Sequence, residues 1–479
     1  MMEEDKMEFD SKTYIDEYIK RARIAQKEYE KYTQVQIDEV VRAVAKVVHD
    51  NAEYLAEISV DETGMGVVAD KIAKNKNKAK MIWNSLKGKK SIGIIERDDT
   101  KGITKIAKPM GVVAAITPCT NPIVTPMSNI MFALKGGNAI IITPHHKAIN
   151  CSTKAIDMMN AELDKLGAPK NLIQILDQQS RENTKNLISN ADIVIATGGM
   201  GMVKAAYSSG KPALGVGAGN VQAIIDMDVD IKTTAPQIIV GRTFDNGIIC
   251  SGEQSIIMPE ARYEEMLQEF EKNGAFVISD QEGKEAIRNA LFVDGAMNRH
   301  AVGQSVDTLA KLAKIEIPEG TRVIIVEADG SGEADILAKE KMCPVIAAFK
   351  YNTFQEGVEI AKANLEVEGK GHSVSIHSNT KENIEYAGKE LSVSRFLINQ
   401  TCATSAGGSF YNGLVPTNTL GCGSWGNNSI SENLDYKHLI NVSRIAYFMK
   451  DNHVPTDEEL WEMTALNASS KAASSSLKS

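Results

Sequence analysis

The sequence lacks long apolar runs, paired cysteine motifs and an excess of positive charge. None of its apolar runs approaches the roughly 18 residues of a membrane-spanning helix, so no transmembrane segment is expected. The net charge is −9 at pH 7, and this acidic balance argues against a nucleic-acid or membrane-surface role, since both require basic faces. The first ten residues are acidic and have no apolar core, so no signal peptide is expected.

Cysteine is sparse and scattered. No C-x-x-C occurs, and no cysteine has a histidine at metal-ligand spacing, so neither a disulfide framework nor a metal site is expected. The pattern predicts free thiols in a reducing cytoplasm. The six cysteines are Cys119, Cys151, Cys250, Cys343, Cys402 and Cys422.

The chain has 479 residues, which is too long for one compact core and predicts two or three domains. From residue 111 short apolar segments alternate with helical stretches, which is typical of βαβ units and a parallel α/β sheet. A second α/β unit begins near Val221. The strands expected in the first unit are Val112–Thr117, Ala139–Thr143, Leu172–Leu176 and Asp192–Thr197.

The N-terminal region is predicted to be helical, and Thr33 with Gln36 forms a capping-box pattern. Residues 91–96 and 102–107 predict two strands joined by a charged turn. This hairpin is either an arm between domains or subunits or a simple surface hairpin. The Ser/Ala-rich residues 467–479 are expected to be disordered.

Three loops follow strands of the first unit, at residues 117–122, 143–147 and 197–201. Parallel sheets bind ligands at the carboxyl ends of their strands, so these loops are candidate ligand-binding segments. The amide of Asn121 can donate to an oxyanion, although an Asn that turns the chain before Pro122 is common. Gly198 and Gly199 would let a dinucleotide phosphate approach backbone N–H groups.

Cys250 lies in a loop between a predicted helix, residues 231–242, and an apolar strand, residues 255–258. A loop thiol on a rigid scaffold can be a nucleophile, but a buried inert cysteine is the commoner case. The glycine-dense segment 215–220 precedes it and indicates close backbone approach by a ligand or another strand.

The order of Asn121, the glycine loops, Cys250 and Glu340 resembles the aldehyde dehydrogenase superfamily over nearly the whole chain. The resemblance implies that Cys250 is the nucleophile, that Asn121 holds the oxyanion and that Glu340 holds the nicotinamide ribose. The cofactor-binding residues that it implies are Thr117, Pro118, Thr143, His145, His146, Thr197, Gly198, Gly199, Gly217 and Glu340.

The resemblance also implies an α/β fold with a Rossmann-like nucleotide-binding domain, an α/β catalytic domain and a β oligomerisation arm. The nucleotide-binding domain would comprise residues 1–90 and 109–221, and the catalytic domain residues 222–425. The arm would comprise 91–108 and 426–449, followed by a C-terminal extension, 450–479. Family members pair through such arms, so a homodimer or a dimer of dimers is expected.

Gly215 departs from the hydrolytic members, which carry a general-base glutamate at this position. Without a base, water attacks an acyl-enzyme poorly, whereas a thiol is a better nucleophile near neutral pH. The chain therefore resembles the CoA-acylating branch, as do segments 244–250, 371–372 and 419–426. Segments 198–204, 248–255 and 436–445 are similar to members that act on succinate semialdehyde; acylating sulfoacetaldehyde and acetaldehyde dehydrogenases are near neighbours.

The expected reaction is reversible oxidation of an aldehyde to acyl-CoA with NAD(P)+. His146 replaces a glutamate that would repel a 2′-phosphate, which favours NADP over NAD. For an anionic substrate tail Arg242 and Arg395 are candidate partners, but either could be structural. His372 could contact CoA or be structural, and Ser405 lies in a plausible substrate loop. The fold is expected to lower the pKa of Cys250.

Three other functions remain open on the sequence alone. A hydrolytic aldehyde dehydrogenase is disfavoured by Gly215. An acyl-phosphate reductase shares the superfamily fold but not the segments of the CoA-acylating branch. A catalytically inactive structural subunit is disfavoured because Asn121, Cys250 and Glu340 occur together.

Overall fold

The computed structural model describes residues 10–461. The chain forms two compact units. One contains the chain up to Ile92 together with Lys108–Asn441, and the other contains Gly93–Ala107 and the chain from Val442 onward. The larger unit includes residues 426–441, and the arm bounds that we expected stay a prediction. No helix within residues 10–461 is long and apolar enough to cross a membrane.

The larger unit begins with four helices, in the region that the sequence predicted to be helical. The Thr33 hydroxyl accepts from the backbone N–H of Gln36, and the Gln36 side chain accepts from the N–H of Thr33, so the predicted capping box is confirmed. The helices are α1 (Ser11–Tyr29), α2 (Gln34–Asp50), α3 (Ala52–Thr63) and α4 (Val68–Leu86).

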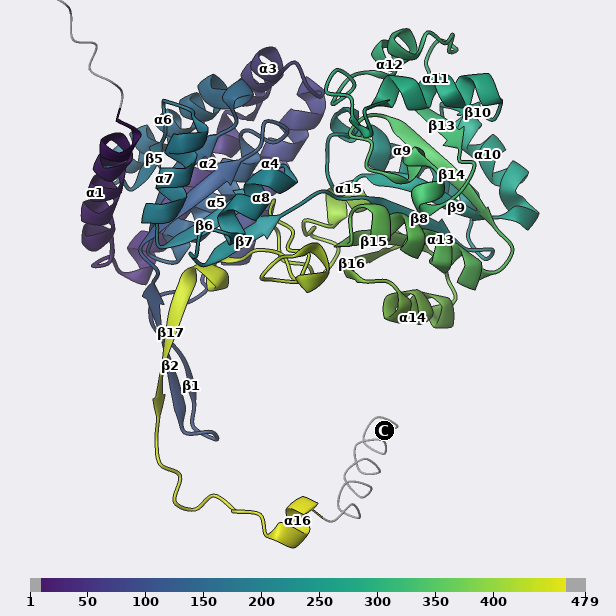
Figure 1. The fold of residues 1–479 in the computed structure, drawn as a ribbon. Helices are drawn as coiled ribbons and strands as arrows, with labels where there is room; N and C mark the ends of the chain where they lie inside the picture. Colours follow the sequence, from purple (N-terminus) through teal and green to yellow (C-terminus); the bar gives the residue numbers. More distant parts are fainter. Residues whose placement is uncertain (1–9, 462–479) are drawn as a thin grey trace, which may run out of the picture. The chain divides into compact units, whose positions relative to one another are not determined.

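A five-stranded parallel sheet follows, in the order β5-β4-β3-β6-β7 (Figure 1). β3 and β4 are buried along their whole length, which explains why they are continuous apolar runs rather than alternating ones. Its elements are β3 (Val112–Thr117), α5 (Val124–Lys135), β4 (Ala139–Pro144), α6 (Ile149–Lys165), β5 (Ile173–Ile175), α7 (Arg181–Asn190), β6 (Ile193–Thr197), α8 (Met200–Tyr207) and β7 (Ala213–Val216).

A seven-stranded parallel sheet makes up the rest of the larger unit, in the order β10-β13-β14-β9-β8-β15-β16. Alternate side chains of one strand enter two separate apolar cores, as the two-residue period of a strand requires. In β13, for example, Ile324 belongs to one core and Ile325 to the other. Helices α9–α14 lie between the strands of this sheet in chain order, and a short helix, α15, follows β16.

The strands of this second region are β8 (Val221–Ile225), β9 (Glu253–Pro259), β10 (Ala275–Ile278), β13 (Val323–Glu327), β14 (Val345–Tyr351), β15 (Gly371–His377) and β16 (Val393–Ile398), with a small hairpin of β11 (Phe292–Val293) and β12 (Ala296–Met297). Its helices are α9 (Ile231–Thr243), α10 (Tyr263–Lys272), α11 (Gln281–Leu291), α12 (Val306–Ala313), α13 (Phe354–Val367), α14 (Lys381–Glu390) and α15 (Cys402–Ser405).

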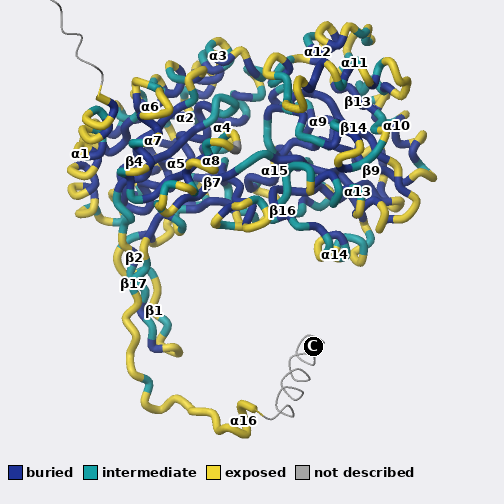
Figure 2. The backbone as a smooth tube through the Cα atoms, viewed as in Figure 1, coloured by how far each residue is buried: buried dark blue, intermediate teal, exposed yellow. Residues whose placement is uncertain are grey.

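The predicted hairpin is present as β1 (Gly93–Asp98) and β2 (Ile103–Pro109), which pair antiparallel. β17 (Ile440–Ala446) adds to β2, and a short helix, α16 (Asp457–Trp461), follows. Most of this segment is exposed, unlike the strands of the two parallel sheets (Figure 2). Its exposed apolar side chains include Phe448, which is 92% exposed, and Tyr447. The predicted disordered tail, 467–479, lies outside the described residues.

Candidate active site

Cys250 lies on a tightly held loop between α9 and β9. The loop opens with a 3-10 turn, η2 (Phe244–Gly247), in which Asp245 and Asn246 both have left-handed backbones, with φ of 54° and 52°. Such conformations are costly for residues other than glycine and are concentrated at functional sites. The Arg242 guanidinium donates to the carbonyl oxygens of Gly247 and Glu253, so it fixes both ends of the loop.

Two cavities of the larger unit share Cys250 and Asn121 in their linings. The larger has a volume of about 770 Å³ and is lined by the loops that follow β3, β4 and β6. The smaller has a volume of about 130 Å³ and is lined by α4, the Cys250 loop and residues near α15. Cys250, a half-buried residue, therefore lies in the walls of both cavities.

All ten residues that the sequence assigned to the cofactor line the larger cavity. The Thr117 hydroxyl is buried there and, within residues 10–461, has no hydrogen-bond partner, so it can bond to a ligand. A Cβ added at Gly198 or Gly199 would have no atom within 4 Å, which leaves their backbone open to the cavity. The residues therefore fit a dinucleotide at the carboxyl ends of the strands.

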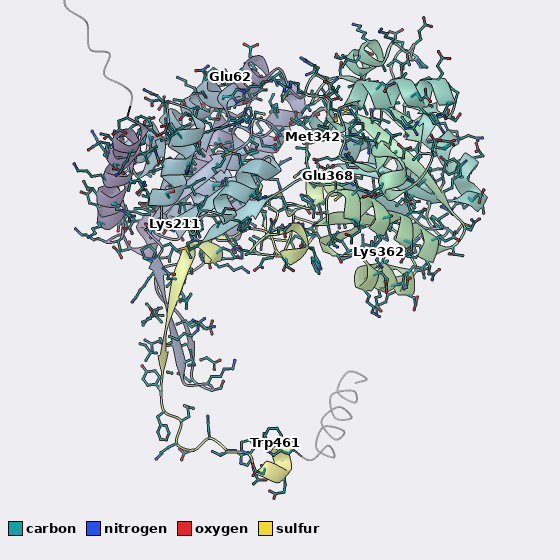
Figure 3. The ribbon with its side chains drawn as sticks, viewed as in Figure 1. Glu62, Lys211, Met342, Lys362, Glu368 and Trp461 are labelled. Atoms are coloured by element: carbon teal, nitrogen blue, oxygen red, sulfur yellow. The ribbon has the colours of Figure 1, made fainter. Side chains whose placement is uncertain are left out.

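Glu340 lies between the glycine-dense segment and a second carboxylate. Its Oε1 accepts from the backbone N–H of Gly219 at 3.3 Å, and its own N–H donates to Glu368 Oε2 at 2.9 Å. Glu368 and Met342 also line the larger cavity, and both are labelled in Figure 3. Burial raises the pKa of Glu340 to about 8, and the charge of Glu368 adds to this shift.

The fold does not lower the pKa of Cys250 as expected. Burial raises the pKa of the thiol to about 12, with further contributions from Glu340 and Cys422, while Arg395 opposes them. Removal from water disfavours the thiolate, and here no adjacent cation outweighs that cost. The thiol is therefore protonated at neutral pH.

The glycine-dense segment serves the close approach of two backbones. A Cβ at Gly219 would lie 1.9 Å from the carbonyl oxygen of Cys250, so only glycine fits there. Gly215, in β7, has a different role. A Cβ there would lie 2.8 Å from both Tyr207 and Val203, and Gly215 is not among the residues that line either cavity.

The structure brings neither candidate arginine to a cavity wall. Arg242 is fully buried beneath the Cys250 loop. Arg395, in β16, donates to the carbonyl oxygens of His372 and Gly421 and to the Ser373 hydroxyl, so its donors are used within the protein. Both positions suit the structural alternative.

His372 and Ser405 are also set back from the cavities. His372 is fully buried, and within residues 10–461 neither ring nitrogen has a hydrogen-bond partner. Burial, with Arg395 nearby, lowers its pKa to about 3, so the ring is neutral. Ala403 and Thr404 line the smaller cavity, whereas Ser405 is not among its lining residues.

Two lysines of α4 line the smaller cavity beside Cys250, and the sequence reasoning missed both. Lys74 Nζ donates to Asn121 Oδ1 at 2.7 Å, and Lys78 Nζ donates to the carbonyl oxygens of Gly407 and Thr417. Desolvation lowers the pKa of Lys78 to about 8, although the nearby Cys250 thiolate would favour its charged form. A signal was available, because Lys71, Lys74 and Lys78 recur at helical spacing.

A protein-family model described as "Aldehyde dehydrogenase family" matches residues 5–414 of this chain. The chain belongs to this family. It is 56% identical over 447 residues to the acetylating succinate-semialdehyde dehydrogenase of Clostridium kluyveri, covering 93% of this chain and 98% of that relative. It is 41% identical over 451 residues to the sulfoacetaldehyde dehydrogenase of Acholeplasma sp, covering 93% of each.

A solved structure, the acetylating aldehyde dehydrogenase from Geobacillus thermoglucosidasius, matches with a TM-score of 0.89 and 36% sequence identity. The match covers 93% of this chain and 98% of that one. The predicted fold class and the resemblance to acylating aldehyde dehydrogenases are therefore confirmed. The domain boundaries and the roles of individual site residues stay predictions.

Proposed function

We propose that this protein oxidises an aldehyde to an acyl-CoA, with Cys250 as the nucleophile and coenzyme A as the acyl acceptor. The observation that carries this proposal is the position of Cys250 and Asn121 in the walls of both cavities, combined with Gly215 where hydrolytic members carry their base. The contact of Gly215 with Tyr207 and Val203 leaves no room for a longer side chain at that position.

In the oxidative direction, the Cys250 thiol gives up its proton to solvent as its sulfur forms a bond to the aldehyde carbon, and the π electrons of the carbonyl move to its oxygen, which becomes an oxyanion. The amide of Asn121 and the backbone N–H of Cys250 donate to this oxygen, and one such donor is worth about 10²–10³ in rate. A nicotinamide dinucleotide in the larger cavity supplies the hydride acceptor. The thiol of CoA then attacks the resulting thioester, which releases acyl-CoA and returns the sulfur of Cys250. The same steps in reverse reduce an acyl-CoA.

We assign the larger cavity to the dinucleotide, with Glu340 on the nicotinamide ribose and residues 197–199 beside the phosphates. His145 and His146, whose ring centroids lie 4.1 Å apart, line the same cavity. Two imidazoles in place of a carboxylate remove a repulsion from a 2′-phosphate, which supports NADP over NAD.

For the substrate we propose succinate semialdehyde. The 56% identical relative bears that name, and the smaller cavity offers a cation for the carboxylate tail. Lys78 fits this role better than Arg242 or Arg395. An ammonium has three donors, and the two backbone carbonyls leave one of them for a ligand. A sulfonate would be attracted to the same cation, which keeps sulfoacetaldehyde as the alternative.

We further propose a cytoplasmic enzyme that pairs with a second copy through β1, β2 and β17. The six cysteines are free, which fits a reducing compartment. The exposed apolar side chains of this segment, such as Ile94 and Ile445, are suited to burial against another subunit.

A substrate panel tests the function directly. Succinate semialdehyde, sulfoacetaldehyde, acetaldehyde and butyraldehyde are compared by kcat/KM with NAD and with NADP, each with and without CoA. We expect CoA-dependent turnover, fastest with succinate semialdehyde and NADP. Rapid turnover without CoA would contradict acyl transfer, and a wide preference for acetaldehyde would contradict the anionic subsite. Acyl phosphate, tested as an oxidant in place of acyl-CoA, separates the remaining enzymatic alternative.

A further inference from the structure

Lys74 contacts the oxyanion donor and the nucleophile loop at once. Its side chain is 7% exposed, and its Nζ lies 2.7 Å from Asn121 Oδ1 and 2.6 Å from Asp245 Oδ2. Asn121 follows β3 of the first sheet, whereas Asp245 lies five residues before Cys250 on the loop that leads to the second sheet. One ammonium group therefore joins the two segments that must meet at the reacting carbonyl.

The contact with Lys74 determines which end of the Asn121 amide faces the site. An ammonium only donates hydrogen bonds, so the atom that faces it must be the amide oxygen. The NH2 group is then directed away from Lys74, and its partner within the protein is the Thr120 hydroxyl, at a long 3.4 Å. A rotated amide would place two N–H donors against a cation. Lys74 thus keeps the Asn121 NH2 available for an oxyanion.

Asp245 holds Lys74 in place and is itself firmly held. Its carboxylate also accepts from Lys71 Nζ at 3.0 Å and from the backbone N–H of Val67 at 2.9 Å. Its own N–H donates to Asp70 at 2.8 Å. Burial opposes ionisation, but Lys74 and Lys71 nevertheless hold the pKa of Asp245 below its ordinary value, so the carboxylate stays charged.

The charges of this buried cluster balance. Lys71 and Lys74 both pair with the Asp245 carboxylate, and Asp70 accepts from the backbone N–H of Asp245. A lysine held only by Asp245 would be a structural ion pair. The second contact, to Asn121, distinguishes Lys74 from Lys71, whose second contact is to the carbonyl oxygen of Thr120 at 3.5 Å.

We propose that Lys74 is a positioning residue for the oxyanion donor: it orients the Asn121 amide toward the Cys250 sulfur and ties it to the nucleophile loop through Asp245. This inference rests on the proposed roles of Cys250 and Asn121. It assigns Lys74 an effect on the rate of tetrahedral-intermediate formation that operates through Asn121 alone.

The test is a double-mutant cycle on acylation of Cys250 by p-nitrophenyl acetate. The burst of p-nitrophenol requires the nucleophile and the oxyanion donors but no aldehyde, dinucleotide or CoA. Its outcome is therefore separate from that of the substrate panel. The burst rate constant is measured for the wild type, Lys74→Met, Asn121→Ala and the double variant, with thermal unfolding recorded for each.

We expect Lys74→Met and Asn121→Ala each to slow the burst by about 10²–10³, the effect of losing one oxyanion donor. The double variant should be no slower than Asn121→Ala alone, because without the Asn121 amide the loss of Lys74 has no oxyanion donor to misorient. Lys71→Met is the matched control. It removes a cation from the same carboxylate and should lower thermal stability, with a much smaller effect on the burst.

An unchanged burst in Lys74→Met would overturn the proposal. So would a double variant whose loss equals the product of the two single losses, since Lys74 would then act independently of Asn121. If Lys71→Met slowed the burst as much as Lys74→Met does, both changes would be acting through the structure of the cluster, and the proposal would also be overturned. If Lys74→Met does not fold, Lys74→Gln keeps a donor for Asp245 without the charge, and the same cycle and criteria apply.

Discussion

The close approach of Gly219 to the Cys250 carbonyl makes Gly219→Ala an informative single change. The added methyl would lie 1.9 Å from that oxygen and 2.8 Å from its carbon, and both atoms belong to the backbone, which cannot rotate away as a side chain can. Ordinary contact begins near 3.4 Å, so the two segments must separate by about 1.5 Å. A misplacement of about 1 Å at a reacting group costs about 100-fold in rate.

We therefore expect Gly219→Ala to lower kcat for CoA-dependent aldehyde oxidation by at least about 100-fold. The assay follows formation of the reduced dinucleotide at saturating CoA, with thermal unfolding as a check on folding. Gly388→Ala is the control, because a Cβ at that position in α14 has no atom within 4 Å. Wild-type turnover in Gly219→Ala, with an unchanged unfolding temperature, would refute the close approach and the role of glycine there.

Three further perturbations follow from the site. Lys78→Met should lower kcat/KM for succinate semialdehyde by about one to two orders of magnitude, which is the effect of losing one charged hydrogen bond. The kcat/KM for butyraldehyde should stay nearly unchanged. Equal losses with both aldehydes would contradict the anionic subsite. Because the Cys250 pKa is raised to about 12, alkylation of this cysteine by iodoacetamide, without added substrates, should accelerate about tenfold per pH unit from about pH 7 to about pH 10. The alkylation rate is measured by mass spectrometry of the peptide that contains Cys250. A plateau near neutral pH would show instead that the thiolate already dominates there. Gly215→Glu should lower thermal stability without producing CoA-independent turnover, since the new side chain meets Tyr207 and Val203. A gain of hydrolysis would show instead that the site can accommodate a working base at this position.

The sequence predicted the strands that hold the site because they are buried on both faces and read as uninterrupted apolar runs. Val112–Thr117 was predicted with its observed bounds, and the loops that follow β3, β4 and β6 do line one cavity. Cys250 and Asn121 were found because their loops carry distinctive segments, and the structure brings the two residues into the walls of the same cavities.

Other features depend on contacts that sequence spacing does not reveal. Lys74 lies 47 residues from Asn121 and 171 from Asp245, in the N-terminal region that was predicted to be helical but was not assigned to the site. Arg242 precedes the nucleophile loop in sequence, yet the fold turns its guanidinium toward backbone carbonyls. The pKa of Cys250 was misjudged because desolvation is a property of the packed site and leaves no local pattern.

The sharing of Cys250 by two cavities has a kinetic consequence. If the larger cavity, at about 770 Å³, holds the dinucleotide as proposed and the smaller one, at about 130 Å³, holds the substrate tail, CoA would reach the sulfur through the same cavity as the dinucleotide. They then occupy it in turn, while the acyl chain waits on the other side of the thioester. CoA should accordingly compete with the oxidised dinucleotide rather than with the aldehyde, and the reduced dinucleotide must depart before acyl transfer begins. On this assignment, the sequence in which the dinucleotide and CoA bind follows from their use of the same cavity.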